Sequence, residues 1–301
     1  MAVSIEKKYQ KLTDTEHVLL RPGMYVGSIK PHTEEVFLPM KGKDQFQLTE
    51  VTYNPGFLKL FDEIVSNSVD EHKRNAKLNK VKVDIDMATG QISIWDNGGI
   101  PVKIHKEYDE WVPEMIFSNL KAGSNFDDTE DRVVVGTNGV GSTLTNIFSK
   151  EFIIETCDGK KQFVQTFKNN MSDRTKAKIT NKKTAFTKIT YLTDFERFGL
   201  KGINKNHYLM ITKRLIDIAA CNPTLKIFLN DKPIAFRTFK DYASRYVTPV
   251  FYDQSEHWKI GIGHSTTGFK AISFVNSVET KDGGTHVNNI DWQITSYLRD
   301  K

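Results

Sequence analysis

Polar residues recur at helical spacing between positions 55 and 70. Glu63, Asn67 and Asp70 stand at i, i+4 and i+7, so a helix would carry them on one stripe. Glu63 could act as a general base on water, and the carboxamide oxygen of Asn67 could bind Mg²⁺, which prefers oxygen ligands. The alternative is an ordinary solvated helix face, which is the commoner explanation when such a stripe stands alone.

A second group ends a segment of alternating apolar residues. Asp96 closes this segment and is followed by Asn97, Gly98 and Gly99. A carboxylate at a strand end could accept a hydrogen bond from an exocyclic amine such as that of adenine, and glycines let the backbone approach a flat ring. The alternative is a simple turn, because Asp-Asn-Gly-Gly is a favourable turn sequence.

A third group is a glycine loop that precedes apolar residues at helical spacing. Gly136, Gly139 and Gly141 would leave backbone N–H groups free at a helix start, where they and the helix dipole could bind phosphate. The loop is not a Walker loop, because no Gly-Lys-Ser/Thr ends it. A plain joint between a loop and a helix is the alternative.

The surrounding pattern predicts elements that would position these groups. Asn54 suits an N-cap and Pro55 the first position of a helix, and alternation over 81–85 and 92–94 predicts a hairpin. The remaining pattern predicts a hairpin over 152–156 and 162–167, a strand over 186–192, a helix over 209–221, strands around Ile227, Ile260 and Ile272, and a final helix after Gly283 and Gly284.

Composition limits the class of protein. The chain has 301 residues, 39% hydrophobic and 26% charged, which suits a globular protein of two domains. Its two cysteines are far apart, so we expect no disulfide or zinc site and a cytoplasmic location, in the host cell if the source is viral. We expect no membrane partner, because no apolar run reaches the about 20 residues of a membrane helix. The net charge of +5 permits a nucleic-acid partner without demanding one.

The order of the three groups resembles that of the GHKL ATPases. Longer phrases resemble the type IIA DNA topoisomerases, with similarity to the eukaryotic branch and, more closely, to the T-even bacteriophage branch. These phrases lie over 9–13, 16–28, 113–117, 124–128, 146–149, 274–277 and 283–287.

The resemblance implies a fold, a domain order and a function. The fold would be α+β, with the helix layer of a GHKL (Bergerat-type) domain on a mixed β-sheet. We expect an exchange arm over 1–28, an ATP-binding domain over 29–223 and the N-terminal part of a truncated transducer domain over 224–301. The implied function is that of an N-gate, in which ATP-driven dimerisation through the swapped arm captures a DNA duplex, with cleavage performed by another region or subunit.

The resemblance also implies roles for individual residues. Glu63 would be the catalytic base, Asn67 the Mg²⁺ ligand, and Asp96 the acceptor of the adenine amine, with Thr187 beside it. Tyr9 would reach the nucleotide of the other subunit. The remaining implied ATP contacts are Ser124, Asn125, Gly136, Thr137, Asn138, Gly139, Val140, Gly141, Ser142 and Thr143.

Three departures from the family pattern affect these expectations. Gly98 and Gly99 are adjacent where the family has an intervening residue, and Thr143 stands where the eukaryotic enzymes have lysine. The family's transducer lysine would fall beyond Lys301, so we expect this chain to bind ATP better than it hydrolyses it. Two alternatives stay open: a nucleotide-dependent dimerisation module with negligible turnover, and a chaperone or mismatch-repair member of the GHKL class.

One basic tract has no place in these roles. Residues 168–188 include several lysines and Arg174, which could contact a phosphate backbone. A solvated loop beside a strand is an equally good interpretation.

Overall fold

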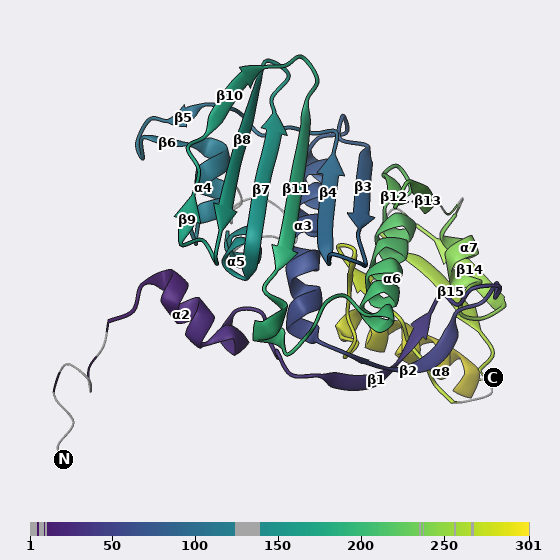
Figure 1. Cartoon of the computed structure of the whole chain (residues 1–301). Helices are drawn as coiled ribbons and strands as arrows, with labels where there is room; N and C mark the ends of the chain where they lie inside the picture. The colour runs from purple at the N-terminus through teal and green to yellow at the C-terminus, as the bar shows by residue number, and fades with distance from the viewer. Residues whose placement is uncertain are drawn as a thin grey trace.

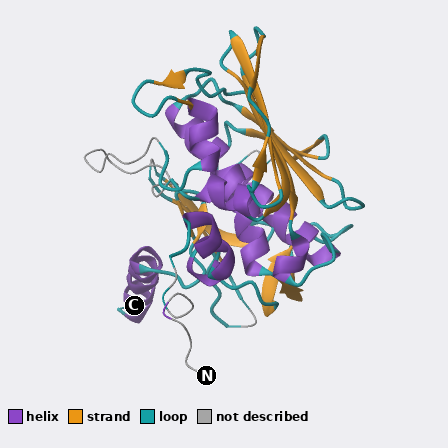
Figure 2. Cartoon of the chain, turned by 60° about the vertical axis from the view of Figure 1, so that its left-hand side comes forward, coloured by secondary structure: helices purple, strands orange, loops and turns teal. Residues whose placement is uncertain are grey.

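A large sheet carrying helices on one side dominates the structure (Figures 1 and 2). The computed structural model describes Ile5, Tyr9, residues 11–123, 139–234, Phe236, 238–255, 257–265 and 268–300. The helices are α2 (Asp14–Leu20), η1 (Pro22–Met24), α3 (Pro55–Arg74), α4 (Val112–Ser118), α5 (Gly141–Ile147), η2 (Phe195–Phe198), α6 (Lys205–Cys221), α7 (Phe239–Ala243) and α8 (Thr285–Arg299).

The large sheet has nine strands in the order β10-β8-β7-β11-β4-β3-β12-β13, with β9 beside β8. Its strands are β3 (Lys80–Ile85), β4 (Gln91–Asp96), β7 (Ser149–Cys157), β8 (Lys161–Lys168), β9 (Asp173–Arg174), β10 (Lys178–Asn181), β11 (Phe186–Thr193), β12 (Lys226–Leu229) and β13 (Lys232–Ile234). Among the described strands, β12 and β3 pair in parallel and the other neighbours are antiparallel. The predicted α+β class with a mixed sheet is confirmed.

Helix α3 forms the centre of the helix layer. The Asn54 side chain accepts a hydrogen bond from the Phe57 backbone N–H at 3.0 Å, and Pro55 takes the first helical position, as predicted. The inner face of α3 buries Phe57, Phe61 and Val65 in the main core. Burial of each such side chain stabilises the fold by about 1.5–3 kcal/mol.

Helix α5 packs directly on α3. The Thr145 hydroxyl donates to the Leu60 carbonyl oxygen at 3.0 Å, which joins the two helices through a buried bond. This contact fixes the start of α5, at Gly141, beside the outer face of α3.

One strand expected in the second unit belongs to the large sheet. The strand at Ile227 was placed in that unit, but β12, which follows α6, pairs in parallel with β3. We therefore propose a boundary after Ile234 rather than at 223. The strand expected at Ile272 begins instead at Phe274.

Several small elements escaped the sequence patterns. A separate hairpin, β1 (His32–Leu38) and β2 (Gln47–Tyr53), packs against α6. The others are β5 (Ile104–His105), β6 (Glu110–Trp111), β14 (Pro249–Gln254) and β17 (Val278–Glu279). Their neighbours β15 (Lys259–Gly263) and β16 (Phe274–Val275) correspond to the strands expected around Ile260 and Ile272. None of the helices among the described residues has the length and apolar character needed to span a membrane.

Candidate functional site

One cavity of about 560 Å³ lies between α3, the ends of β4 and β11, and the start of α5. All three sequence groups contribute to its wall. The predicted residues that line it are Glu63, Asn67, Asp96, Gly139, Val140, Gly141, Ser142 and Thr187.

Glu63 lies at the polar end of the cavity. Its carboxylate contacts the Lys59 ammonium at 2.5 Å, one helical turn earlier. On its other side is Gly141, where an added Cβ would lie 1.6 Å from Glu63 Oε2. The carboxylate is therefore held between a cation and the bare backbone that starts α5.

Asp96 is buried at the opposite end. The Ser68 hydroxyl donates to Asp96 Oδ2 at 2.7 Å, and the Gly98 N–H donates to Oδ1 at 2.9 Å. Burial raises the pKa of the Asp96 carboxyl to about 6, although both donors oppose that shift. The remaining lone pairs of this carboxylate can accept a hydrogen bond from a further donor, such as a ligand amine.

Thr187 stands beside Asp96, because the two residues are paired in register between β11 and β4. The Thr187 and Thr156 hydroxyls lie 3.0 Å apart. Thr156 Oγ1 also accepts from the Ile100 N–H at 3.0 Å, which fastens the loop after Asp96 to β7.

The close approach of this loop to β7 explains the glycine at position 99. At Gly99, where φ is +154°, an added Cβ would lie 2.3 Å from the Cys157 carbonyl oxygen. The shortened loop thus lies directly on the end of β7, and only glycine fits there.

The other predicted contacts divide into three groups. Thr143 does not line the cavity, because it is buried and its hydroxyl donates to the Asn119 carbonyl oxygen at 3.0 Å. Tyr9 is 69% exposed, away from the cavity of its own chain. Outside the described residues lie Ser124, Asn125, Gly136, Thr137 and Asn138.

Sequence reasoning missed several residues of the wall. Lys59 and Arg74 could have been found, since they lie on the stripe of Glu63 and Asn67, one turn before and two turns after. Ser68 gave no signal, because a helical serine is uninformative until the strand beneath it is known. The apolar wall includes Ile94, Ile100, Ile116, Phe117 and Ile189.

The arrangement suits an amphipathic anion with a flat base. Apolar side chains and Asp96 surround one end, whereas Lys59, Glu63 and the start of α5 surround the other. The donor set also fits Mg²⁺: Asn67 offers a carboxamide oxygen at an exposed position, and this cation commonly takes few protein ligands and completes its shell with phosphates and water.

Part of the basic tract forms local ion pairs. Lys168 pairs with Glu151 at 3.3 Å, and Arg174 pairs with Glu114 at 2.9 Å. These pairs occupy two of its cations at the sheet edge and leave both interpretations of the tract open.

The pKa of Asp96 gives a testable pH dependence. If its carboxylate accepts a base amine, binding favours the ionised form, so nucleotide affinity should fall as pH drops through about 6. Between pH 7.5 and pH 5 we expect a loss of about tenfold, since the ionised fraction falls by that factor. Asp96→Asn keeps an acceptor but cannot titrate. The nucleotide affinity of this variant, measured by calorimetry, should change with pH no more than the titration of the phosphates requires. If the variant shows the same pH dependence as the unsubstituted protein, Asp96 does not bind the base amine.

Comparisons with known proteins agree with the geometry. No family model matches the chain. It is 43% identical to DNA topoisomerase 2 of Acanthamoeba polyphaga mimivirus and 40% identical to DNA topoisomerase 2 of Arabidopsis thaliana, over 98% of the chain in each case. The matches cover only 25% and 21% of those relatives, so the chain spans about a quarter of their length or less.

Solved structures match more completely. The ATPase region of Saccharomyces cerevisiae topoisomerase II superposes with a TM-score of 0.93 at 36% identity, covering 99% of this chain and 81% of that one. The ATPase and transducer domains of Balamuthia mandrillaris topoisomerase II give 0.93 at 37%, covering 98% and 78%. The Thermus thermophilus gyrase B ATPase domain, at 22% identity and a TM-score of 0.64, shares the fold.

The mixed sheet, its helix layer and the cavity between them define the GHKL class of nucleotide-binding folds. Within that class, identity and coverage are sufficient for a family assignment. The chain belongs to the family of type II DNA topoisomerase ATPase regions.

Proposed function

We propose that this chain binds and hydrolyses ATP as the N-gate of a type II DNA topoisomerase. The observation that carries the proposal is the meeting of Glu63, Asn67, Asp96 and the start of α5 around one cavity. The similar solved structures, which are ATPase regions of type II topoisomerases, support the same function.

Different residues act at the two ends of the cavity. Asp96 accepts the adenine amine, and the apolar wall receives the ring. At the other end Glu63 takes a proton from a water molecule that attacks the γ-phosphorus, which releases ADP and phosphate. Mg²⁺ held by Asn67 would neutralise phosphate charge when bound.

Dimerisation connects this chemistry to DNA. Tyr9, on the exposed arm, reaches the nucleotide of the partner subunit, so that ATP binds the closed dimer in preference to open monomers. Closure captures a DNA duplex, and hydrolysis reopens the gate. Cleavage of DNA belongs to a further region or subunit.

Within the family, we propose that the chain groups with the T-even bacteriophage branch. Its support is sequence phrasing alone, together with Asp96 and Thr143 at positions where the eukaryotic pattern has asparagine and lysine. A nucleotide-dependent dimerisation module without turnover is the second candidate, favoured by the absence of a family lysine at Thr143.

Sedimentation velocity tests the gate directly. A non-hydrolysable ATP analogue with Mg²⁺ should convert the chain from monomer to dimer, because the ligand contacts both subunits. The guanosine analogue should leave it monomeric, since its carbonyl oxygen would face the Asp96 carboxylate. A sedimentation coefficient unchanged at every ATP analogue concentration would contradict the gate.

A further inference from the structure

The tight turn between β16 and β17 has an unusual backbone. Asn276 has a φ of +52° and Ser277 a φ of +71°, so both residues are left-handed. Asparagine adopts this conformation readily, but serine does so much less often. Ser277 is also buried. A buried serine in this conformation requires surrounding contacts that hold it, and such sites are often functional.

Contacts from α6 hold the turn. Arg214 donates through NH1 to the Ser277 carbonyl oxygen, and Asn222 donates through Nδ2 to the Ser277 hydroxyl at 3.0 Å. Lys73, near the end of α3, donates to the Asn276 carbonyl oxygen at 3.1 Å. The turn therefore contacts both α6 and α3, the helix that lines the cavity.

Arg214 also reaches the cavity wall. Its Nε donates to Asp62 Oδ1 at 2.6 Å, and the two side chains are only 19% and 24% exposed. Asp62 lines the cavity and directly precedes Glu63 on α3. A charge-assisted bond shielded from water is stronger than a surface ion pair, so this contact resists relative movement of α3 and the turn.

We infer that Arg214 is a positioning residue that couples the nucleotide site to the β16–β17 turn. One guanidinium bonds at the same time to the helix that carries Glu63 and to the strained turn of the C-terminal segment. A ligand that shifts or rigidifies α3 changes the turn, and a partner that moves the turn changes ligand affinity by the same factor. The inference rests on the proposed function in taking the ligand of the cavity to be ATP.

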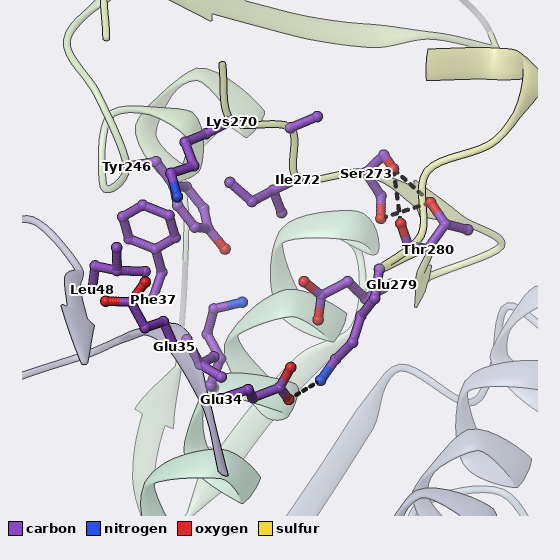
Figure 3. Close-up of a pocket in the computed structure, with 14 residues that line it drawn as sticks. Glu34, Glu35, Phe37, Leu48, Tyr246, Lys270, Ile272, Ser273, Glu279 and Thr280 are labelled. Carbon is purple, nitrogen blue, oxygen red and sulfur yellow. Dashed lines mark hydrogen bonds and ion pairs between the residues drawn. The ribbon is translucent and has the colours of Figure 1, made fainter. Parts of the chain in front are cut away.

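A contact between the C-terminal segment and a different part of the chain offers a matched control. Lys281, just after β17, pairs with Glu34 on β1. Both residues line a separate cavity of about 250 Å³, in which Figure 3 labels Glu34. The Glu34 side chain lies on the β1–β2 hairpin and has no contact with α3 among the described interactions. Lys281→Met thus loosens the C-terminal segment without touching the nucleotide helix.

Hydrogen exchange measures the coupling. In the unsubstituted chain, saturating non-hydrolysable ATP analogue with Mg²⁺ should slow amide exchange in residues 272–280, and Lys281→Met should keep this response. Arg214→Met should lose the response and weaken analogue binding by about tenfold. Asp62→Asn should reproduce both effects, and the double variant should add less than twofold, because either change breaks the same bond.

The outcomes separate this inference from the proposed function. If the unsubstituted chain fails to bind the analogue, the proposed function is wrong. If it binds the analogue and Arg214→Met keeps both affinity and the exchange response at 272–280, the coupling is wrong and the function stands. Arg214→Lys serves if the methionine variant does not fold: it retains charge but cannot bond Asp62 and Ser277 together, so an undiminished exchange response in the lysine variant also overturns the coupling.

Discussion

Replacing Glu63 with glutamine should reduce ATP turnover by about a hundredfold to ten-thousandfold, the usual contribution of a positioned general base. Glutamine has the same shape and can hold the same place between Lys59 and Gly141, but it cannot take a proton from water. Binding of a non-hydrolysable analogue should therefore change by less than about threefold, a factor worth under one kcal/mol.

The measurement is single-turnover hydrolysis of radiolabelled ATP by the unsubstituted and Glu63→Gln proteins. Glu151→Gln is the control, because Glu151 lies on β7 outside the cavity and pairs with Lys168. Unchanged turnover in the Glu63 variant would show that Glu63 is not the base. Nucleotide-dependent dimerisation without measurable turnover in the unsubstituted protein would favour the dimerisation module.

The sequence was sufficient for the central layers of the fold. Asn54 and Pro55 mark the start of α3 by local chemistry alone, and alternation marks β3 and β4, because each signal depends on neighbours within a few residues. The place of β12 depends instead on a parallel partner about 145 residues earlier, at Lys80–Val83. No local pattern reveals such a pairing, so the sequence did not place β12 in the large sheet.

The candidate site also combines residues that local sequence reveals with residues that only the fold brings together. The stripe of Glu63 and Asn67 follows from helical periodicity, and both residues line the cavity. Thr143 was expected among the ATP contacts from the resemblance. In the structure it is the third residue of α5, and its hydroxyl donates to the Asn119 carbonyl oxygen. Ser68 and Arg214 lie outside any motif, and their roles depend on Asp96 and Ser277, which only the folded chain brings near them.

Gly141 supplies the second large effect. Gly141→Ala should reduce turnover by about a hundredfold, because a displacement of the base by about 1 Å can cost that much. The added Cβ would lie 1.6 Å from Glu63 Oε2 and 2.5 Å from Cδ, so the carboxylate must leave its position beside Lys59. The fold itself should survive, since the displaced atoms are the end of a flexible side chain and alanine favours a helix. Thermal unfolding checks that survival.

A double variant shows whether Gly141 acts through Glu63. When Glu63 is already alanine, the space beside position 141 is open, and Gly141→Ala should then alter analogue binding by less than about twofold. In the Glu63 background the same substitution should lower the maximal hydrolysis rate far more than it raises KM, because the displaced group acts on the attacking water. If Gly141→Ala weakens analogue binding equally in both backgrounds, glycine is needed there for the backbone path into α5. Its closeness to the carboxylate would then have no catalytic consequence.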